Sequence, residues 1–145
     1  MVNKQMKIIY TSLFIIISQF IYAQDEVINP NGYNYFYYQN GKVSSEGNMR
    51  NGKPSGFWKT YYNTGELKSE GNRKNFLLDS VWNFYQKSGT ISEIINYRYG
   101  KKNGYYFKNS INKNDSVNFG KLISKELYLN DIKQGLSYYY KNGKI

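Results

Sequence analysis

The chain repeats a pattern with a 24-residue period, and this periodicity constrains its fold more than any other feature. The residues that keep the period are of several kinds, namely Gly32, Gly56 and Gly104 with Ser80 in the remaining place; Gly41, Gly65 and Gly89; Trp58 and Trp82; Tyr61 and Tyr85; and Val43, Leu67 and Ile91. Periods of roughly 20 to 50 residues are typical of architectures in which each repeat stacks on the next. The sequence therefore predicts a stacked repeat protein.

Five units are predicted within residues 32–145, namely 32–55, 56–79, 80–103, 104–134 and a partial unit, 135–145. The fourth unit carries an insertion of about seven residues around Asn109 to Asn118. Gly120 resumes the pattern, because it precedes Gly135 by the same 15 residues that separate Gly41 from Gly56. The partial unit is compatible with a frayed end, a capping half-hairpin or a truncated chain.

Each unit has the pattern of a β-hairpin. Aromatic-rich runs end at pairs such as Asn40-Gly41 and Ser88-Gly89, and glycine supplies the positive φ that tight hairpin turns need. A second run of alternating character follows, and a pair such as Asn51-Gly52 leads to the next unit. No apolar stripe at helical spacing is present, so we predict an all-β, elongated antiparallel meander.

Residues 56–70 read Gly-Phe-Trp-Lys-Thr-Tyr-Tyr-Asn-Thr-Gly-Glu-Leu-Lys-Ser-Glu, and Asn51-Gly52-Lys53 precedes them. This pattern resembles the MORN-repeat variant of many bacterial proteins, and the resemblance covers most of residues 32–145. It departs from that pattern at Asn34, where a tryptophan is expected, and at Phe76, where a glycine is expected. The resemblance implies a scaffold architecture, and related repeat proteins are often labelled antitoxin-like.

The first residues are typical of a secretory signal peptide. Lys4 and Lys7 precede an apolar run from Ile8 to Tyr22, which ends at the small residue Ala23. We predict a signal peptide over 1–23, a linker over 24–31, and a periplasmic, outer-membrane-associated or extracellular destination. An uncleaved membrane anchor is the alternative, although the apolar run is short for a span of about 20 residues.

The chain contains no histidine and no cysteine, which removes Ser-His and Cys-His nucleophile pairs and most zinc sites. Glu46 and Glu70, 24 residues apart, are the best candidates for a catalytic carboxylate pair. A cross-strand charge pair with Lys59 or Lys68 is the favoured reading of these two residues. We therefore expect no enzyme activity, no cofactor and no metal site.

Binding residues are predicted from adjacent tyrosines, because neighbours in a strand point to opposite faces and one of each pair should be exposed. The predicted binding residues are Tyr38, Tyr62, Tyr106 and Tyr139, with Lys101 and Lys102. Trp58 and Trp82 are predicted to be core residues, and the glycines at 32, 41, 56, 65, 89, 104, 120 and 135 to be structural.

The net charge of +10 becomes +8 without residues 1–23, which contain Lys4 and Lys7 and no acidic residue. A basic exported protein meets acidic surfaces or polymers rather than nucleic acid. The leading prediction is an exported scaffold that binds a protein or an envelope polymer through a sheet face. The alternatives are an antitoxin-like protein and a carbohydrate-binding module, and contact with a membrane surface and self-association stay open.

Overall fold

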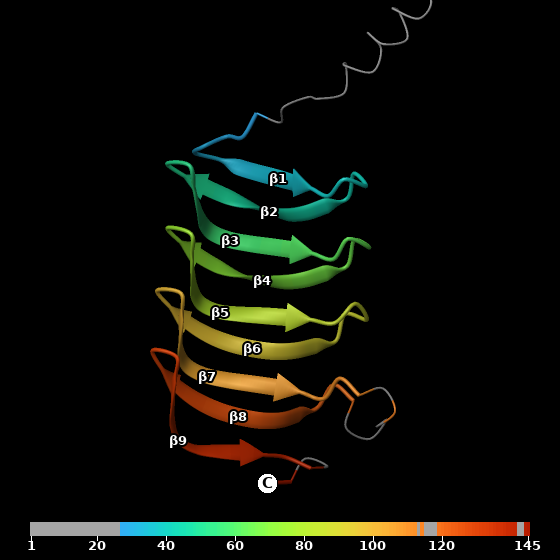
Figure 1. The fold of residues 1–145 in the computed structure, drawn as a ribbon, viewed down its shortest axis with the longest axis vertical. Helices are drawn as coiled ribbons and strands as arrows, with labels where there is room; N and C mark the ends of the chain where they lie inside the picture. Colours follow the sequence, from blue (N-terminus) through green and yellow to red (C-terminus); the bar gives the residue numbers. More distant parts are fainter. Residues whose placement is uncertain (1–26, 113, 115–118, 142–143) are drawn as a thin grey trace, which may run out of the picture.

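The computed structural model describes residues 27–112, 114, 119–141 and 144–145 (Figure 1). The predicted signal peptide and the first three residues of the predicted linker lie outside this range. The described residues form one open sheet of nine strands in the order β1-β2-β3-β4-β5-β6-β7-β8-β9, and each strand is antiparallel to its neighbours. This confirms the predicted all-β antiparallel meander. In this part of the chain there is no helix with the length and hydropathy of a membrane span.

The strands are β1 (Tyr33–Tyr37), β2 (Val43–Arg50), β3 (Lys53–Tyr61), β4 (Leu67–Lys74), β5 (Leu77–Tyr85), β6 (Ile91–Arg98), β7 (Lys101–Asn109), β8 (Leu122–Leu129) and β9 (Ile132–Tyr139). Val43, Leu67 and Ile91 begin successive even-numbered strands, so the 24-residue spacing of the sequence is also the spacing of the strands. Thirteen positions separate Asn109 from Leu122, whereas six separate Tyr85 from Ile91, so seven residues are added before β8.

The connections lie in two columns along the opposite sides of the sheet (Figure 1). We call one column the short-turn edge; its turns are the residue pairs 51–52, 75–76, 99–100 and 130–131. The other, the long-turn edge, contains residues 38–42, 62–66, 86–90 and the longer connection from β7 to β8. Every short turn has positive φ at both residues, which matches the right-handed twist of the flanking strands. Phe76 keeps this geometry with φ 71°, although it stands where a glycine was expected.

One face of the sheet carries the buried side chains, and we call it the Trp face. Trp58 and Trp82 are 5% and 1% exposed. Each indole lies over a glycine of the preceding strand, because Gly47 is opposite Trp58 and Gly71 is opposite Trp82. A Cβ at Gly71 would lie 2.5 Å from the Trp82 ring, so no larger residue fits there without movement. The indole nitrogen of Trp82 donates to the Asn72 carbonyl at 2.7 Å, which satisfies its one polar group.

The same positions change together along the sheet. In the next pair the glycine position holds Ile95, and the residue opposite it is Tyr106 rather than tryptophan. In β8 the position holds Glu126, whose side chain is 12% exposed and is paired with Lys133 at 3.0 Å. A small residue thus accompanies the largest side chain, and a larger residue accompanies a smaller ring, as close packing requires. The Trp face is therefore aromatic near β3–β5 and polar near β8–β9.

The N-terminal end of the Trp face is closed by Asn34, which occupies the tryptophan position in β1 and is 7% exposed. Its amide nitrogen donates to the carbonyls of Asn29 and Gly32 at 2.8 and 2.9 Å, and its amide oxygen accepts from the Asn29 backbone N–H at 2.7 Å. The departure from tryptophan at Asn34 therefore ties residues 29–32 to the first strand.

We predict that Gly71→Ala lowers the free energy of unfolding by about 2–3 kcal/mol, because the added methyl group overlaps the Trp82 ring. Gly41→Ala is the matched control: it lies in open space at φ 77°, so it should cost only about 1 kcal/mol of backbone strain. Urea titration of each variant measures both values. The double variant Gly71→Ile, Trp82→Tyr copies the natural Ile95–Tyr106 pair and should be more stable than the sum of its single variants; strict additivity would contradict the packing argument.

Candidate binding surface

The face opposite the tryptophans exposes a set of large apolar side chains, and we call it the open face. Side chains alternate along each strand, so the residues next to Asn34, Trp58, Trp82 and Tyr106 point to this side. The exposed apolar residues of the open face are Tyr33, Tyr35, Tyr37, Phe57, Val81, Tyr105, Leu127, Leu136 and Tyr138, with exposed fractions from 38% to 78%. Isolated exposed apolar residues are ordinary, but a set that lies on one face is typical of an interaction surface.

Part of this set forms a straight row across the sheet. Tyr33, Phe57, Val81 and Tyr105 recur at the 24-residue spacing and lie in alternate strands, so neighbours in the row are about 9–10 Å apart. The strands between them present Asn48, Asn72 and Asn96, which lie opposite Tyr33, Phe57 and Val81 in the register. The row therefore alternates apolar surface with amide hydrogen-bonding groups.

Charged residues of alternating sign lie beside this row. Glu46 and Glu70 are both directly opposite Lys59. The Tyr61 hydroxyl donates to Glu46, and the Tyr85 hydroxyl donates to Glu70 at 2.6 Å. Burial, followed by the hydrogen bond to Glu70, raises the pKa of Tyr85 to about 12. The pKa of Tyr61 is raised for the same reasons, with Glu46 as its partner. The predicted cross-strand arrangement with Lys59 is present, and both carboxylates serve as acceptors within the sheet.

The C-terminal part of the open face contains a small recess of about 160 Å³ between β8 and β9. Its walls include Tyr105, Leu127, Leu136 and Tyr138, and Lys125 also lines it. The Lys125 ammonium lies 4.2 Å from the centre of the Tyr105 ring, a cation–π contact. This end of the face therefore offers apolar walls beside a positive charge.

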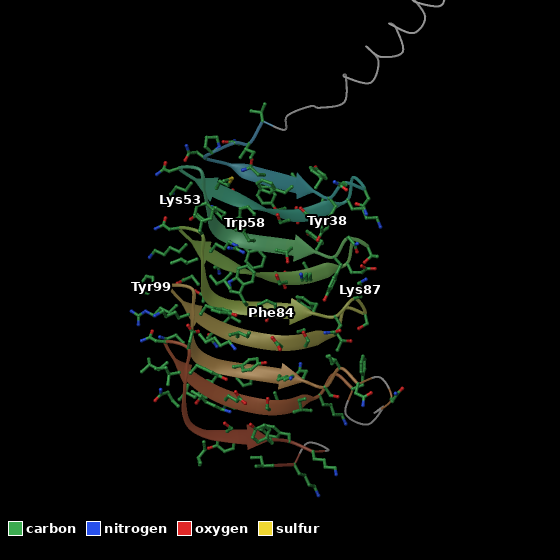
Figure 2. The ribbon with its side chains drawn as sticks, in the orientation of Figure 1. Tyr38, Lys53, Trp58, Phe84, Lys87 and Tyr99 are labelled. Atoms are coloured by element: carbon green, nitrogen blue, oxygen red, sulfur yellow. The ribbon has the colours of Figure 1, made fainter. Side chains whose placement is uncertain are left out.

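Two of the predicted binding tyrosines, Tyr38 and Tyr62, lie at the long-turn edge (Figure 2). Both are half-buried. The Tyr38 hydroxyl donates to the Tyr61 carbonyl and the Tyr62 hydroxyl to the Tyr85 carbonyl, each at 2.7 Å. These hydrogen bonds join each long turn to the next hairpin, so both side chains have a structural partner.

The other predicted binding residues occupy different places. Tyr106 is half-buried on the Trp face, where its hydroxyl donates to Glu93 at 2.9 Å. Tyr139 ends β9 and is 61% exposed. Lys101 is exposed at the short-turn edge, whereas the Lys102 ammonium lies 4.8 and 5.1 Å from the ring centres of Tyr106 and Tyr128. The structure does not bring these residues into one surface with Tyr38 and Tyr62.

The sequence did contain a signal for the open-face row that was not used. Tyr33, Phe57, Val81 and Tyr105 each stand directly before the tryptophan position of a unit, so their side chains must point away from the buried indoles. Gly47 and Gly71 were missed in the same way, although they also lie 24 residues apart. Reading the residue on either side of each conserved-period tryptophan identifies the buried and the open face together.

Within the described residues, no group of three or more His, Cys, Asp or Glu side chains is placed to hold a metal ion. Comparison with protein-family models gave no match, and comparison with curated proteins gave none.

The tyrosine–glutamate pairs predict a loss of stability at alkaline pH. A raised tyrosine pKa means that the fold favours the neutral hydroxyl, so the contribution of Tyr85 is complete below the unfolded pKa of about 10. It is lost as the pH rises through the folded pKa of about 12. The free energy of unfolding, measured by urea titration at each pH, should fall over this interval and fall less steeply in Tyr85→Phe. Parallel curves for the two proteins would contradict the assignment.

Proposed function

We propose that this chain is an exported, non-enzymatic repeat scaffold that binds a protein or an envelope polymer through its open face. The observation that carries the proposal is the position of the nine large apolar side chains named above, which are exposed on the side of the sheet away from the tryptophans. A monomeric protein gains nothing in stability from such a surface, and a partner would bury it.

The arrangement of the face supports recognition of an extended partner. Its apolar row runs across the strands at a constant spacing, so one interaction can be repeated along a long molecule. The aromatic residues in it provide large contact areas with few rotatable bonds, which favours binding. Export is part of the proposal because of the signal-peptide pattern in residues 1–23.

A carbohydrate-binding module is the second candidate, and one feature of β1 favours it. Tyr33, Tyr35 and Tyr37 are 48%, 50% and 47% exposed on the same face. The ring centres of Tyr33 and Tyr35 are 5.3 Å apart in an edge arrangement. Exposed rings of this kind suit the apolar faces of sugars as well as protein side chains. The antitoxin-like function remains a prediction that no particular contact favours.

Membership of the MORN-repeat variant family is part of the same proposal. Its support is the pattern of residues 51–70, together with the positions of that pattern in the strands. The repeated Trp58 and Trp82 are buried, and the repeated short turns share one backbone geometry. A scaffold role fits this arrangement because the repeated residues are accounted for by packing and turns.

Site-specific photo-crosslinking tests the proposed surface. A photoreactive phenylalanine replaces Phe57 or Tyr105 on the open face of the full chain, which is expressed in its own cells, and Gly41 at the long-turn edge serves as the control site. We expect positions 57 and 105 to crosslink the same partner, and position 41 to give no crosslink. Mass spectrometry and glycan staining then distinguish a protein from a polymer.

Two outcomes would count against the proposal. Crosslinks from position 41 with none from 57 and 105 would place binding on another surface. A captured molecule that is chemically altered in proportion to time and protein concentration would indicate an enzyme instead. Recovery of a glycan from positions near Tyr33 and Tyr35 would select the carbohydrate-binding candidate.

A further inference from the structure

The short-turn edge differs from the open face in its charge. Its strand ends carry five exposed basic residues, Arg50, Lys53, Lys74, Arg98 and Lys101. Figure 2 shows Lys53 and Tyr99 along this edge, on the side of the sheet away from Tyr38 and Lys87. Among the described residues, the ion pair that the structure contains joins Lys133 to Glu126, so these five cations are not neutralised by such pairs.

Like charges face each other directly at two of the turns. Arg50 is opposite Lys53 in the register of β2 and β3, and Arg98 is opposite Lys101 in that of β6 and β7. Like charges in cross-strand positions destabilise a sheet. A long turn offers many positions for solvating lysines, so their placement opposite one another at these turns is not explained by folding.

The turns are held at fixed intervals by hydrogen bonds between neighbouring hairpins. The Gly52 N–H donates to the Pro30 carbonyl at 2.9 Å, Phe76 to Pro54 at 3.1 Å, and Gly100 to Leu78 at 2.9 Å. Successive turns are two strands apart, so the basic residues repeat every 9–10 Å or so in a straight line. The edge is therefore a rigid, linear array of positive charge.

Two of the turns also carry an aromatic residue where the backbone disfavours it. Phe76 has φ 71° and Tyr99 has φ 52°, although the corresponding residues of the first turn are Gly52 and Asn51. Both rings are largely in solvent, with exposed fractions of 53% and 62%. Positive φ is costly for bulky residues, and strained residues concentrate at functional sites. The strain here supports ring exposure rather than packing.

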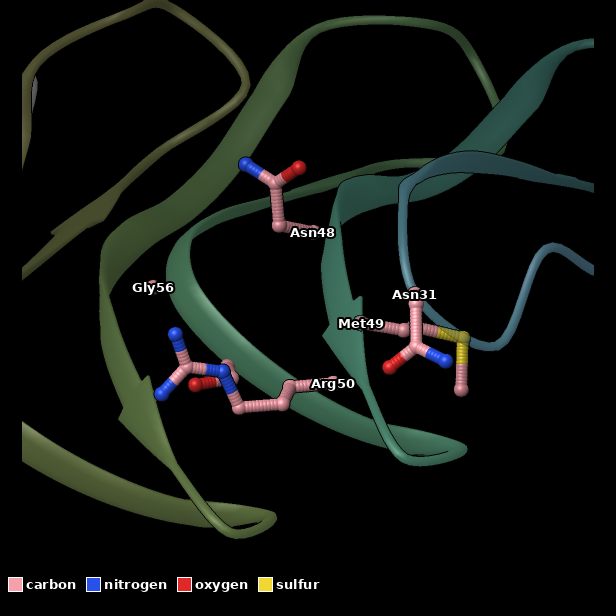
Figure 3. A pocket seen from close by; sticks show the side chains of 6 residues that line it. Asn31, Asn48, Met49, Arg50 and Gly56 are labelled. Atoms are coloured by element: carbon pink, nitrogen blue, oxygen red, sulfur yellow. The ribbon is translucent and has the colours of Figure 1, made fainter.

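A recess beside the first turn adds polar groups to the array. It has a volume of about 420 Å³ and is lined by Asn31, Asn48, Met49, Arg50, Ser55 and Gly56. Figure 3 shows the Arg50 guanidinium beside Gly56, with the Asn48 and Asn31 amides at the same recess. Amides and a guanidinium together supply the donors and acceptors that sugar hydroxyls and acid groups require.

We propose that the short-turn edge from Arg50 to Lys101 binds a linear acidic polysaccharide, which lies along the turns and across the strands. Acid groups of the polymer contact the basic side chains, sugar rings stack on Phe76 and Tyr99, and one sugar unit occupies the Arg50 recess. This surface is separate from the open face, so the inference stands without the proposed function.

The distribution of acids favours a linear polymer over an anionic bilayer. Asp131 lies at the fourth short turn, where its carboxylate accepts from the Lys102 backbone N–H at 2.7 Å. A flat bilayer in contact with the whole edge would meet this negative charge, whereas a chain on the first three turns would not. The other acid near the edge is Asp79, which is half-buried and accepts from the Ser80 hydroxyl at 3.0 Å.

The test measures binding of the purified repeat-bearing chain to polygalacturonate by titration calorimetry at low and moderate salt. The triple variant Lys53→Gln, Lys74→Gln, Lys101→Gln should bind about tenfold or more weakly and show a smaller salt dependence. The control variant, Lys87→Gln, Lys121→Gln, Lys141→Gln, loses the same charge among exposed residues away from the short turns and should bind within about threefold of the natural chain.

Phe76→Gly separates binding from folding. Removal of the strained ring should raise the thermal unfolding midpoint by about 3 °C and should weaken polygalacturonate binding several-fold. Loss of binding through damage to the fold is excluded by the higher midpoint. An unchanged affinity in this variant would overturn the stacking role of the ring.

Three other probes distinguish the class of ligand. Neutral dextran should not bind, and Phe57→Ser on the open face should leave polygalacturonate binding unchanged. Vesicles of phosphatidylglycerol and phosphatidylcholine, and duplex DNA, should bind more weakly and without dependence on Phe76. Equal or tighter binding of either probe, or equal losses in the two lysine variants, would overturn the proposal.

Discussion

The contact between each tryptophan ring and the glycine of the preceding strand is the interaction on which the rest of the sheet depends. A single-layer sheet has no second layer to cover its apolar side chains, so burial must come from neighbours on the same face. Trp58 and Trp82 achieve this by lying flat over Gly47 and Gly71. The large area of an indole, removed from water without a second sheet, contributes a few kcal/mol for each repeat. This contact fixes which face is buried and leaves the opposite face exposed.

The exposed parts of the molecule follow from that choice and differ in chemistry. The open face carries apolar rings and amides in a row, with charges of alternating sign beside it. The short-turn edge carries like charges and two strained rings. The long-turn edge is held by tyrosine hydroxyls that donate to backbone carbonyls. A repeated unit thus gives three different linear surfaces on one scaffold, two of which have no structural explanation for their exposed side chains.

The strand pattern was predictable from the sequence because glycine positions, aromatic runs and turn pairs share one period. The candidate surface was harder to predict because it depends on register. Tyr61 and Tyr62 are adjacent, and a bulge between β3 and β4 falls beside them, so alternation alone does not tell which of the two has a free hydroxyl. Tyr62 proved to bond the next hairpin. The value of Gly47 and Gly71 emerges only when they are seen to lie opposite the tryptophans, because glycine in a strand otherwise indicates weakness.

The change from Gly–Trp pairs to Ile95–Tyr106 and then to Glu126 implies a gradient of stability along the sheet. Native-state hydrogen exchange tests this central claim directly, because it gives an opening free energy for each backbone amide. The account predicts the highest values for the amides of β3, β4 and β5 around Trp58, Gly71 and Trp82, and lower values toward β8 and β9. Equal protection along the sheet, or the highest protection in β8 and β9, would contradict the claim that the tryptophan–glycine contacts hold the repeats together.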